Sequence, residues 1–321
     1  MIVARGLSRT YTTKSGPVAA VRAIDLDVRP GEIVGLLGPN GAGKTTTLRR
    51  LGTLLLPSAG TAMVAGHDVI RDSRAVRRRI GYVAQVGGAP SPGTLLGEEL
   101  ITQARLQGLS KQVAGVRLDE LTEQLDLVGL QRRQLQELSG GQRRRFDIAL
   151  GLMHSPPLIF LDEPTTGLDP QSRANLWQHI RALRDDGGVT IVLTTHYLDE
   201  ADALADRVLV MDGGQIVADD TPDALKARLA GDVITVGLAG PAGGAQVEAA
   251  VRAAIEVREL VWTDTTLIVT VGNGATAVAP LLHALDATGI TPSSIAVNRP
   301  TLEDVFLTLT GRSLRDEKAA R

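Results

Sequence analysis

The spacing of hydrophobic and polar residues divides the chain into blocks with different expected structures. Residues 1–29 contain short alternating segments, such as VAAVRAIDLDV, that predict an antiparallel β layer. Largely apolar runs lie at residues 33–37, 158–162 and 189–195, and such runs are typical of strands buried on both faces of a parallel sheet. A helical pattern, RANLWQHIRALRDD, separates the last two runs. This alternation of strand and helix predicts a parallel α/β core.

A second block, at about residues 90–151, carries apolar positions at helical spacing. Its segments ELITQARLQGL and RLDELTEQLDLVGL run up to Gly108 and Gly129, residues that often end helices. We therefore predict a helical subdomain inserted into the sheet core. Further on, RVLVMDGGQIVADD predicts a closing hairpin whose turn contains Asp212 and Gly213.

After about residue 230 the predicted order becomes β, α, β, β, α, β, which fits a small split βαβ sandwich. We expect a first domain at residues 1–229, an accessory α+β domain at 230–311 and a flexible tail at 312–321. The accessory domain carries no phosphate loop, paired acids or histidine cluster. This favours a regulatory or dimer-stabilising role over a second catalytic one.

Composition narrows the class of protein. The chain has 34 basic and 36 acidic residues, a net charge of −2, so it lacks the basic footprint of a nucleic-acid-binding protein and no nucleic-acid partner is expected. It has no cysteine, which excludes disulfides, thiolate metal sites and thiol catalysis. No apolar stretch approaches the roughly 18 to 20 residues that span a bilayer, and the segment MIVARGLSRTY has no long apolar region or cleavage site. Any membrane span is therefore expected on another chain.

The first candidate site is GPNGAGKT at residues 38–45, which follows the apolar run 33–37. Two glycines separated by four residues and followed by Lys and Thr form the phosphate-loop pattern. Glycine lets successive N–H groups turn inward toward phosphate oxygens, and the helix that starts near Gly43 points its positive end at them. We expect Lys44 to reach the β- and γ-phosphates and Thr45 to supply a hydroxyl to Mg²⁺, with a second hydroxyl from Thr46.

The second candidate site is the acidic pair that ends LIFLDEP. Asp162 and Glu163 follow a predicted buried strand, and ligands of open α/β sheets bind at the carboxyl ends of the strands. Asp162 suits a role in holding Mg²⁺, directly or through water. Glu163 suits the general base that orients and deprotonates the attacking water.

The third motif, LSGGQ at residues 138–142, is not general among phosphate-loop proteins, and with it the sequence resembles the ABC ATPases. The resemblance implies that the motif starts a helix running to Met153 and faces the γ-phosphate bound by another subunit. It further implies that Gln85 in GYVAQ senses Mg²⁺ and the attacking water. Asp169 in TGLDP would lie in the subunit-crossing loop, and His196 would be the switch histidine. A single phosphate loop and a single LSGGQ then imply a dimer, either a homodimer or a dimer with a related ATPase subunit.

Two ring-bearing candidates have alternative explanations. His196 follows a predicted core strand, where a lone histidine is often a structural cap, but the order of motifs favours contact with phosphate. Tyr11 stands where these ATPases place an aromatic ring against adenine, with ordinary packing as the alternative. The other histidines, His67, His154, His179 and His283, are expected to be structural or surface residues.

Other features bear on the subfamily. The segment NRPTLEDVFLTLTGR resembles the tail of the daunorubicin-resistance type of drug-export ATPases. Gly87, Gly88, Pro90, Pro92 and Gly93 predict a flexible segment where such ATPases meet their membrane partner. The GEEL sequence at residues 97–100 departs from relatives that often have Asn before the Leu, so the exact coupling contacts stay open. The arginine runs 77–79 and 143–145 are interpreted as solvated or salt-bridged faces rather than lipid or nucleic-acid patches.

Together these features predict an α/β phosphate-loop ABC ATPase core with an antiparallel β layer, a helical subdomain and a small C-terminal α+β domain. We expect an ATP-hydrolysing subunit on the cytoplasmic face of the cell membrane that drives a separate multi-span permease exporting a hydrophobic drug, lipid or polyketide-like compound. An import ATPase, or a non-transport ATPase acting on ribosomes or DNA, is the alternative. The catalytic candidates are Glu163, His196, Gln85 and Lys44, and the Mg²⁺ candidates are Thr45, Gln85 and Asp162. The nucleotide-binding candidates are Tyr11, Gly38, Pro39, Asn40, Gly41, Ala42, Gly43, Lys44, Thr45, Thr46, Ser139, Gly140, Gly141, Gln142 and Asp169.

Overall fold

The computed structural model describes residues 1–321 except 15, 86–92, 229–230, 239–244, 264 and 311–321. The expected flexible segment around Gly87 and Pro92 and the expected tail at 312–321 therefore lie outside the described residues, apart from Gly93. The chain forms two compact units, Met1–Asp219 and Asp220–Arg321, whereas the sequence analysis places the boundary between residues 229 and 230.

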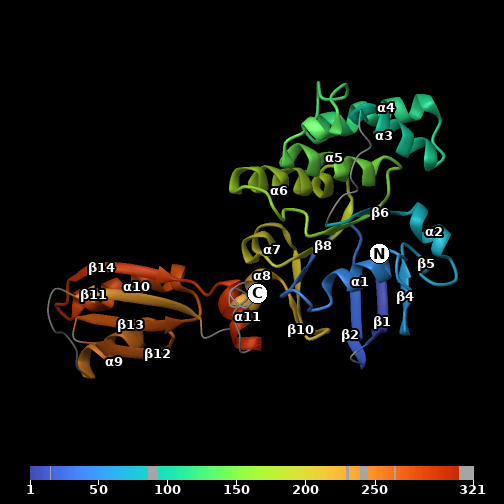
Figure 1. The fold of residues 1–321 in the computed structure, drawn as a ribbon. Helices are drawn as coiled ribbons and strands as arrows, with labels where there is room; N and C mark the ends of the chain where they lie inside the picture. The colour runs from blue at the N-terminus through green and yellow to red at the C-terminus, as the bar shows by residue number, and fades with distance from the viewer. Residues whose placement is uncertain (15, 86–92, 229–230, 239–244, 264, 311–321) are drawn as a thin grey trace. The chain divides into compact units, whose positions relative to one another are not determined.

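The core of the first unit is a six-stranded sheet in the order β10-β9-β3-β8-β7-β6 (Figure 1). Strand β3 pairs in parallel with β8 and β9, and β7 pairs in parallel with β8 and β6, as predicted for the α/β core. The strands are β3 (Ile33–Leu37), β6 (Ile80–Val83), β7 (Leu158–Asp162), β8 (Thr190–Thr195), β9 (Arg207–Asp212) and β10 (Gln215–Asp220). Every residue of β3, β7 and β8 is buried, which explains their largely apolar sequences.

The hairpin between β9 and β10 turns one position later than predicted. Gly213 and Gly214 connect the strands, with φ angles of 52° and 84°. The prediction that Asp212 lies in the turn is wrong, because two consecutive positive φ angles suit a Gly-Gly pair and leave Asp212 in the strand.

One face of the central sheet is covered by the antiparallel layer, in the order β2-β1-β4-β5. Its strands are β1 (Ile2–Thr13), β2 (Gly16–Val28), β4 (Ala59–Val64) and β5 (His67–Asp68), so residues 59–68 extend the layer predicted for residues 1–29. Helix α1 (Lys44–Leu51) lies between β2 and β4 in the chain, and helix α2 (Ser73–Arg78) follows β5. Leu158 and Phe160 of β7 point into the core that this layer and α1 share.

The other face of the sheet packs against the helical subdomain, where Ile159 and Leu161 of β7 join a second core. Figure 1 shows these helices on the opposite side of the sheet from β1 and β2. They are α3 (Leu96–Leu106), α4 (Lys111–Gln124), α5 (Gly140–Leu152) and α6 (Pro170–Asp185), with a 3₁₀ turn at Leu135–Glu137; α7 (Leu198–Leu204) follows β8. Because alternate residues of β7 face opposite ways, one short strand contributes to both cores.

The second unit contains the predicted order of strands and helices. Its sheet runs β12-β13-β11-β14 and its strand pairs are antiparallel. The elements are α8 (Pro222–Ala227), β11 (Asp232–Leu238), α9 (Ala245–Ala254), β12 (Val257–Thr263), β13 (Thr266–Val271), α10 (Gly274–Ala287), β14 (Pro292–Asn298) and α11 (Leu302–Thr310). Helices α9 and α10 contribute Val251 and Leu281 to a core with β11 and β13.

Among the described residues, we find no helix that combines the length and the apolar character needed to cross a bilayer.

Candidate active site

The phosphate loop joins β3 to α1, and its backbone requires glycine at two points. Gly43 caps α1 with φ 98°, and a Cβ there would lie 2.4 Å from the carbonyl oxygen of Ala20. A Cβ on Gly38 would lie 2.3 Å from the carbonyl oxygen of Met211. Any side chain at these positions would displace backbone, so the loop is tied sterically to β2 and β9 as well as to α1.

A cleft of about 500 Å³ opens over this loop. The expected nucleotide and catalytic residues Pro39, Asn40, Gly41, Gly43, Lys44, Thr45, Thr46, Gln85 and Glu163 line it, together with Val18, Ala19, Ala20, Arg22 and Gly213. Gly38 and Ala42 are buried in the loop and do not line the cleft. The tertiary fold thus brings the phosphate loop to Gln85 and Glu163, which are distant in the chain.

Lys44 is held in the loop that it follows. Its side chain is 4% exposed, and Nζ donates hydrogen bonds to the carbonyl oxygens of Gly38 at 2.6 Å and Pro39 at 3.0 Å. Nζ also lies 3.8 Å from Oε1 of Glu163. The buried ammonium group of Lys44 therefore lies between the loop carbonyls and the carboxylate of the candidate base.

Asp162 is fully buried at the end of β7. Its Oδ1 accepts hydrogen bonds from the hydroxyls of Thr45 at 2.8 Å and Thr194 at 2.7 Å. Carboxylate and hydroxyl oxygens are donors that Mg²⁺ prefers, so Thr45 and Asp162 fit that ion. The described residues contain no cluster of three or more His, Cys, Asp or Glu able to hold a metal, and Mg²⁺ sites commonly use few protein ligands together with phosphates.

Glu163 is 6% exposed and has φ 45°, a left-handed conformation that is uncommon outside glycine. Its Oε2 accepts hydrogen bonds from Nε2 of Gln85 at 2.7 Å and from the hydroxyl of Thr166 at 3.1 Å, and Nδ1 of His196 lies 3.3 Å away. Burial alone raises the pKa of this carboxyl, but His196, Lys44 and Thr166 together outweigh it and lower the pKa below its ordinary value. Glu163 is consequently ionised at neutral pH.

The hydroxyl of Thr194 bonds to both acidic residues. It accepts a hydrogen bond from the backbone N–H of Glu163 at 2.9 Å while donating to Asp162. The sequence analysis did not single out Thr194 or Thr166. The sequences LTTH and EPTTG could have indicated them, because Thr194 lies two residues from His196 and Thr166 lies three residues from Glu163.

The LSGGQ motif forms a tightly capped helix start. The hydroxyl of Ser139 accepts a hydrogen bond from the N–H of Gln142, and the side chain of Gln142 accepts one from the N–H of Ser139. Helix α5 then begins at Gly140, as predicted. Asp169 caps α6 by accepting hydrogen bonds from the N–H and hydroxyl of Ser172.

The cleft over the phosphate loop does not include this second set of residues. None of Ser139, Gly140, Gly141, Gln142 and Asp169 is among the described residues that line it. They lie together instead, because a Cβ on Gly141 would come within 3.3 Å of the hydroxyl of Ser172 in the helix that Asp169 caps. One subunit thus contains two separate halves of the expected nucleotide site.

Tyr11 is on β1 opposite Val18, which lines the cleft, although Tyr11 itself does not. The guanidinium of Arg9 lies 4.8 Å from the centre of the Tyr11 ring. Two of the other histidines bond to backbone carbonyls outside the cleft: His154 to Ile80 at 3.0 Å and His179 to Gln124 at 2.9 Å. This is the structural role expected of them.

Two buried charged residues were missed or misinterpreted. Arg144 is 7% exposed and its guanidinium bonds to backbone carbonyls, so the interpretation of residues 143–145 as a solvated or salt-bridged face is wrong at this position. Arg143 and Arg145 do form ion pairs, with Asp147 and Asp126. Glu200, fully buried in α7, accepts a hydrogen bond from Nε1 of Trp177 at 3.2 Å.

A phosphate loop after β3, an Asp–Glu pair at the end of β7 and a capped LSGGQ helix on this fold define an ABC-type ATP-binding cassette. The ABC transporter family profile matches residues 21–166. The daunorubicin resistance ATP-binding protein DrrA3 of Streptomyces coeruleorubidus is 44% identical over 99% of this chain and 98% of its own length. The Nod factor export ATP-binding protein I of Cupriavidus metallidurans is 38% identical, with coverages of 94% and 95%.

Solved structures support the same conclusion. A dimeric post-hydrolysis structure of the ATP-binding cassette MJ0796 with ADP and Pi has a TM-score of 0.62 and 26% identity, covering 69% of this chain and 98% of that chain. The chain belongs to the ATP-binding proteins of the ABC transporter family, in the group typified by the daunorubicin-resistance ATPases. It is an ATP hydrolase, and its relatives favour an export transporter over the alternatives.

Proposed function

We propose that this chain binds MgATP in the cleft over the phosphate loop and hydrolyses it with Glu163 as the general base. The observation that carries this proposal is the position of the Glu163 carboxylate, which lies 3.8 Å from Nζ of Lys44 and accepts a 2.7 Å hydrogen bond from Gln85 in the lining of that cleft. A carboxylate in the lining of a cleft over a phosphate loop is suited to orienting water and taking its proton.

Each surrounding residue has a role that follows from its contacts. Lys44 can exchange its loop carbonyls for β- and γ-phosphate oxygens, since an ammonium group has three donors and a flexible stem. Gln85 and His196 contact Oε2 of Glu163 and would report on the γ-phosphate and the attacking water. Thr45 and Asp162 would hold Mg²⁺, which when bound neutralises charge on the phosphates.

We propose that two subunits assemble head to tail, with the LSGGQ motif of each completing the ATP site of the other. Support comes from the separation of the two half-sites within one subunit, and from a dimeric relative of known structure. The N–H groups at the start of α5 carry a partial positive charge and suit a phosphate. The partner subunit is a second copy of this chain or a related ATPase subunit.

The larger assembly we propose is an exporter. The ATPase dimer would sit at the cytoplasmic face of the cell membrane and drive a separate multi-span permease. The names of the relatives, which describe daunorubicin resistance and Nod factor export, support outward transport, and the cargo we propose is a hydrophobic drug, lipid or polyketide-like compound. We further propose that residues 1–229 form the ATPase domain and residues 230–311 an accessory domain with a regulatory or dimer-stabilising role.

Glu163→Gln tests the catalytic assignment. The amide keeps the shape of the side chain but cannot take a proton, so we expect kcat to fall at least about hundredfold while ATP still binds and the closed dimer accumulates. The measurements are phosphate release, equilibrium binding of a fluorescent ATP analogue and light scattering with MgATP. Glu98→Gln, at an exposed position on α3, is the matched control and should leave all three unchanged. Normal turnover by Glu163→Gln would overturn the assignment.

The trapped variant also tests the assembly. Tagged Glu163→Gln protein with MgATP is expected to co-purify with a stoichiometric polytopic membrane protein from gently solubilised native membranes, as identified by mass spectrometry. Recovery with ribosomal or DNA-bound proteins alone would reject the transporter proposal and leave the ATPase chemistry intact.

A further inference from the structure

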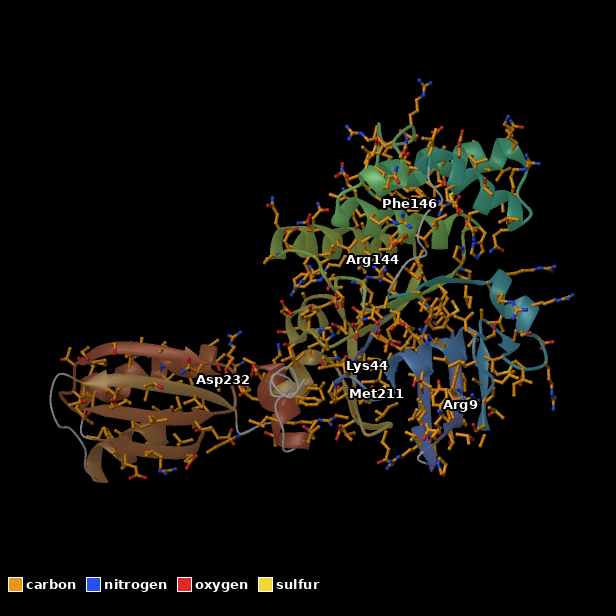
Figure 2. The ribbon with its side chains drawn as sticks, in the orientation of Figure 1. Arg9, Lys44, Arg144, Phe146, Met211 and Asp232 are labelled. Atoms are coloured by element: carbon orange, nitrogen blue, oxygen red, sulfur yellow. The ribbon has the colours of Figure 1, made fainter. Side chains whose placement is uncertain are left out.

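Arg144 occupies an unusual position for a cation. It lies in helix α5, shortly after the LSGGQ motif, and its side chain is buried between this helix and the central sheet (Figure 2). Its neighbours Arg143 and Arg145 pair with carboxylates, whereas the guanidinium of Arg144 donates hydrogen bonds to three backbone carbonyls of the described residues. A buried charge is costly unless it is well paired, so these contacts require a specific explanation.

The three carbonyls belong to the segments that carry the catalytic groups. Nε donates to the oxygen of Pro164 at 2.8 Å and Nη2 to the oxygen of Asp162 at 2.9 Å, one on each side of Glu163. Nη1 donates to the oxygen of Ala84 at 2.7 Å, directly before Gln85. One rigid guanidinium therefore contacts the backbone beside both the candidate base and the residue that bonds to it.

The planar guanidinium fixes the directions of the three hydrogen bonds that Arg144 donates. Its planar fork fixes the angles between its donors, so the three carbonyls are held in one arrangement relative to one another. Burial lowers the pKa of Arg144, while the charges of Asp147, Asp162 and Glu200 act in the opposite direction. An arginine remains protonated in proteins, so the positive charge on the fork is retained.

We propose that Arg144 is a positioning residue that couples the LSGGQ helix to Glu163 and Gln85 of the same subunit. This rests on the proposed roles of Glu163 and of the head-to-tail dimer. Because Arg144 extends from the helix whose first turn faces the partner's nucleotide, a shift of that helix on ATP binding is transmitted to the backbone on both sides of Glu163. The contact between the LSGGQ motif and the ATP bound by the partner subunit thereby affects Glu163, which acts on the ATP bound by its own subunit.

Arg144→Met is the direct test, because methionine keeps an unbranched stem and removes every donor. Arg143→Met is the matched control, one residue away in the same helix, where the side chain pairs with Asp147 and is more exposed. Steady-state hydrolysis gives kcat and KM, and a fluorescent ATP analogue gives the affinity of the resting protein. Glu163→Gln is run beside them as the benchmark for loss of the base.

We expect Arg144→Met to lower kcat by about tenfold to hundredfold, the size of effect that a small misplacement of a catalytic group causes. KM and analogue affinity should stay within about twofold, since Arg144 does not line the cleft. Arg143→Met should leave kcat within about twofold. Arg144→Lys should recover only part of kcat, because one ammonium cannot reproduce the three fixed directions of the fork. It also serves as the test if Arg144→Met does not fold.

Two results would separate this inference from the proposed function. If Glu163→Gln abolishes turnover but Arg144→Met and Arg144→Lys both keep full kcat, the coupling role of Arg144 is rejected and the base assignment stands. An equal loss of kcat and analogue affinity in Arg144→Lys would also reject it, in favour of a purely structural role. If Glu163→Gln turns over normally, the site assignment on which the inference rests fails first.

Discussion

Replacing the buried acid Glu200 with glutamine should change the pH dependence of stability in a defined direction. Burial, the largest effect, raises the pKa of this carboxyl above the ordinary value of 4.5, against the nearby hydroxyls of Thr195 and Thr165, the hydrogen bond from Trp177 and the charge of Arg173. The unfolded chain then loses this proton at a lower pH than the folded protein. The stability that the protonated Glu200 side chain contributes is complete below pH 4.5. It is lost as the pH rises from 4.5 through the pKa of Glu200 in the folded protein.

The size of the effect follows from one proton. Each pH unit between the two pKa values lowers the unfolding free energy of the natural protein by about 1.4 kcal/mol. Glutamine does not titrate, so the unfolding free energy of Glu200→Gln relative to the natural protein should rise by this slope across the same window. Any hydrogen bond that the amide fails to make subtracts a constant, of about 1 kcal/mol, that does not depend on pH.

Urea unfolding followed by tryptophan fluorescence can measure this difference. The chain has two tryptophans, and Trp177 lies directly against Glu200, so a Trp262→Phe background leaves one reporter in the first unit. Glu200→Leu is the control: it also removes the titrating group and should show the same slope with a larger constant loss. A difference between Glu200→Gln and the natural protein that stays constant above pH 4.5 would refute the raised pKa.

Four further substitutions test the cleft and the residues behind it. Lys44→Ala should weaken binding of a fluorescent ATP analogue by about tenfold or more, since a charge-assisted contact is worth about 1.5–3 kcal/mol; unchanged affinity would count against a phosphate role. Thr194→Val removes the hydroxyl that joins Asp162 to the N–H of Glu163, and kcat in a phosphate-release assay should fall about tenfold; full activity would show that the link is dispensable. Gly43→Ala should abolish nucleotide binding and lower Tm, while Gly41→Ala, with open space around the added Cβ, should lose only about 1 kcal/mol from its backbone angle; equal losses would refute the steric argument.

Much of the ATPase core could be predicted because its signals are local. The turn glycines, Lys44 and the apolar run before them lie within a few residues, and the largely apolar runs of β7 and β8 indicate burial on both faces. The start of α5 at Gly140 was equally accessible, since a capping box needs only Ser139 and Gln142. The β9–β10 turn was misplaced by one residue, because Asp-Gly and Gly-Gly both suit such a turn and only the observed φ angles distinguish them.

The sequence by itself therefore determined the class of fold, the phosphate loop and the identity of the acidic pair, because these depend on backbone and burial requirements that neighbouring residues meet. Only the tertiary structure decided what surrounds Glu163. Thr194 lies 32 residues from Asp162 and Arg144 lies 60 residues from Ala84; the first pair meets because β7 and β8 are adjacent, and the second because α5 packs against the face of the sheet that includes β6. A run of three arginines contains no information on which one is buried, since that depends on the face that α5 turns toward the sheet.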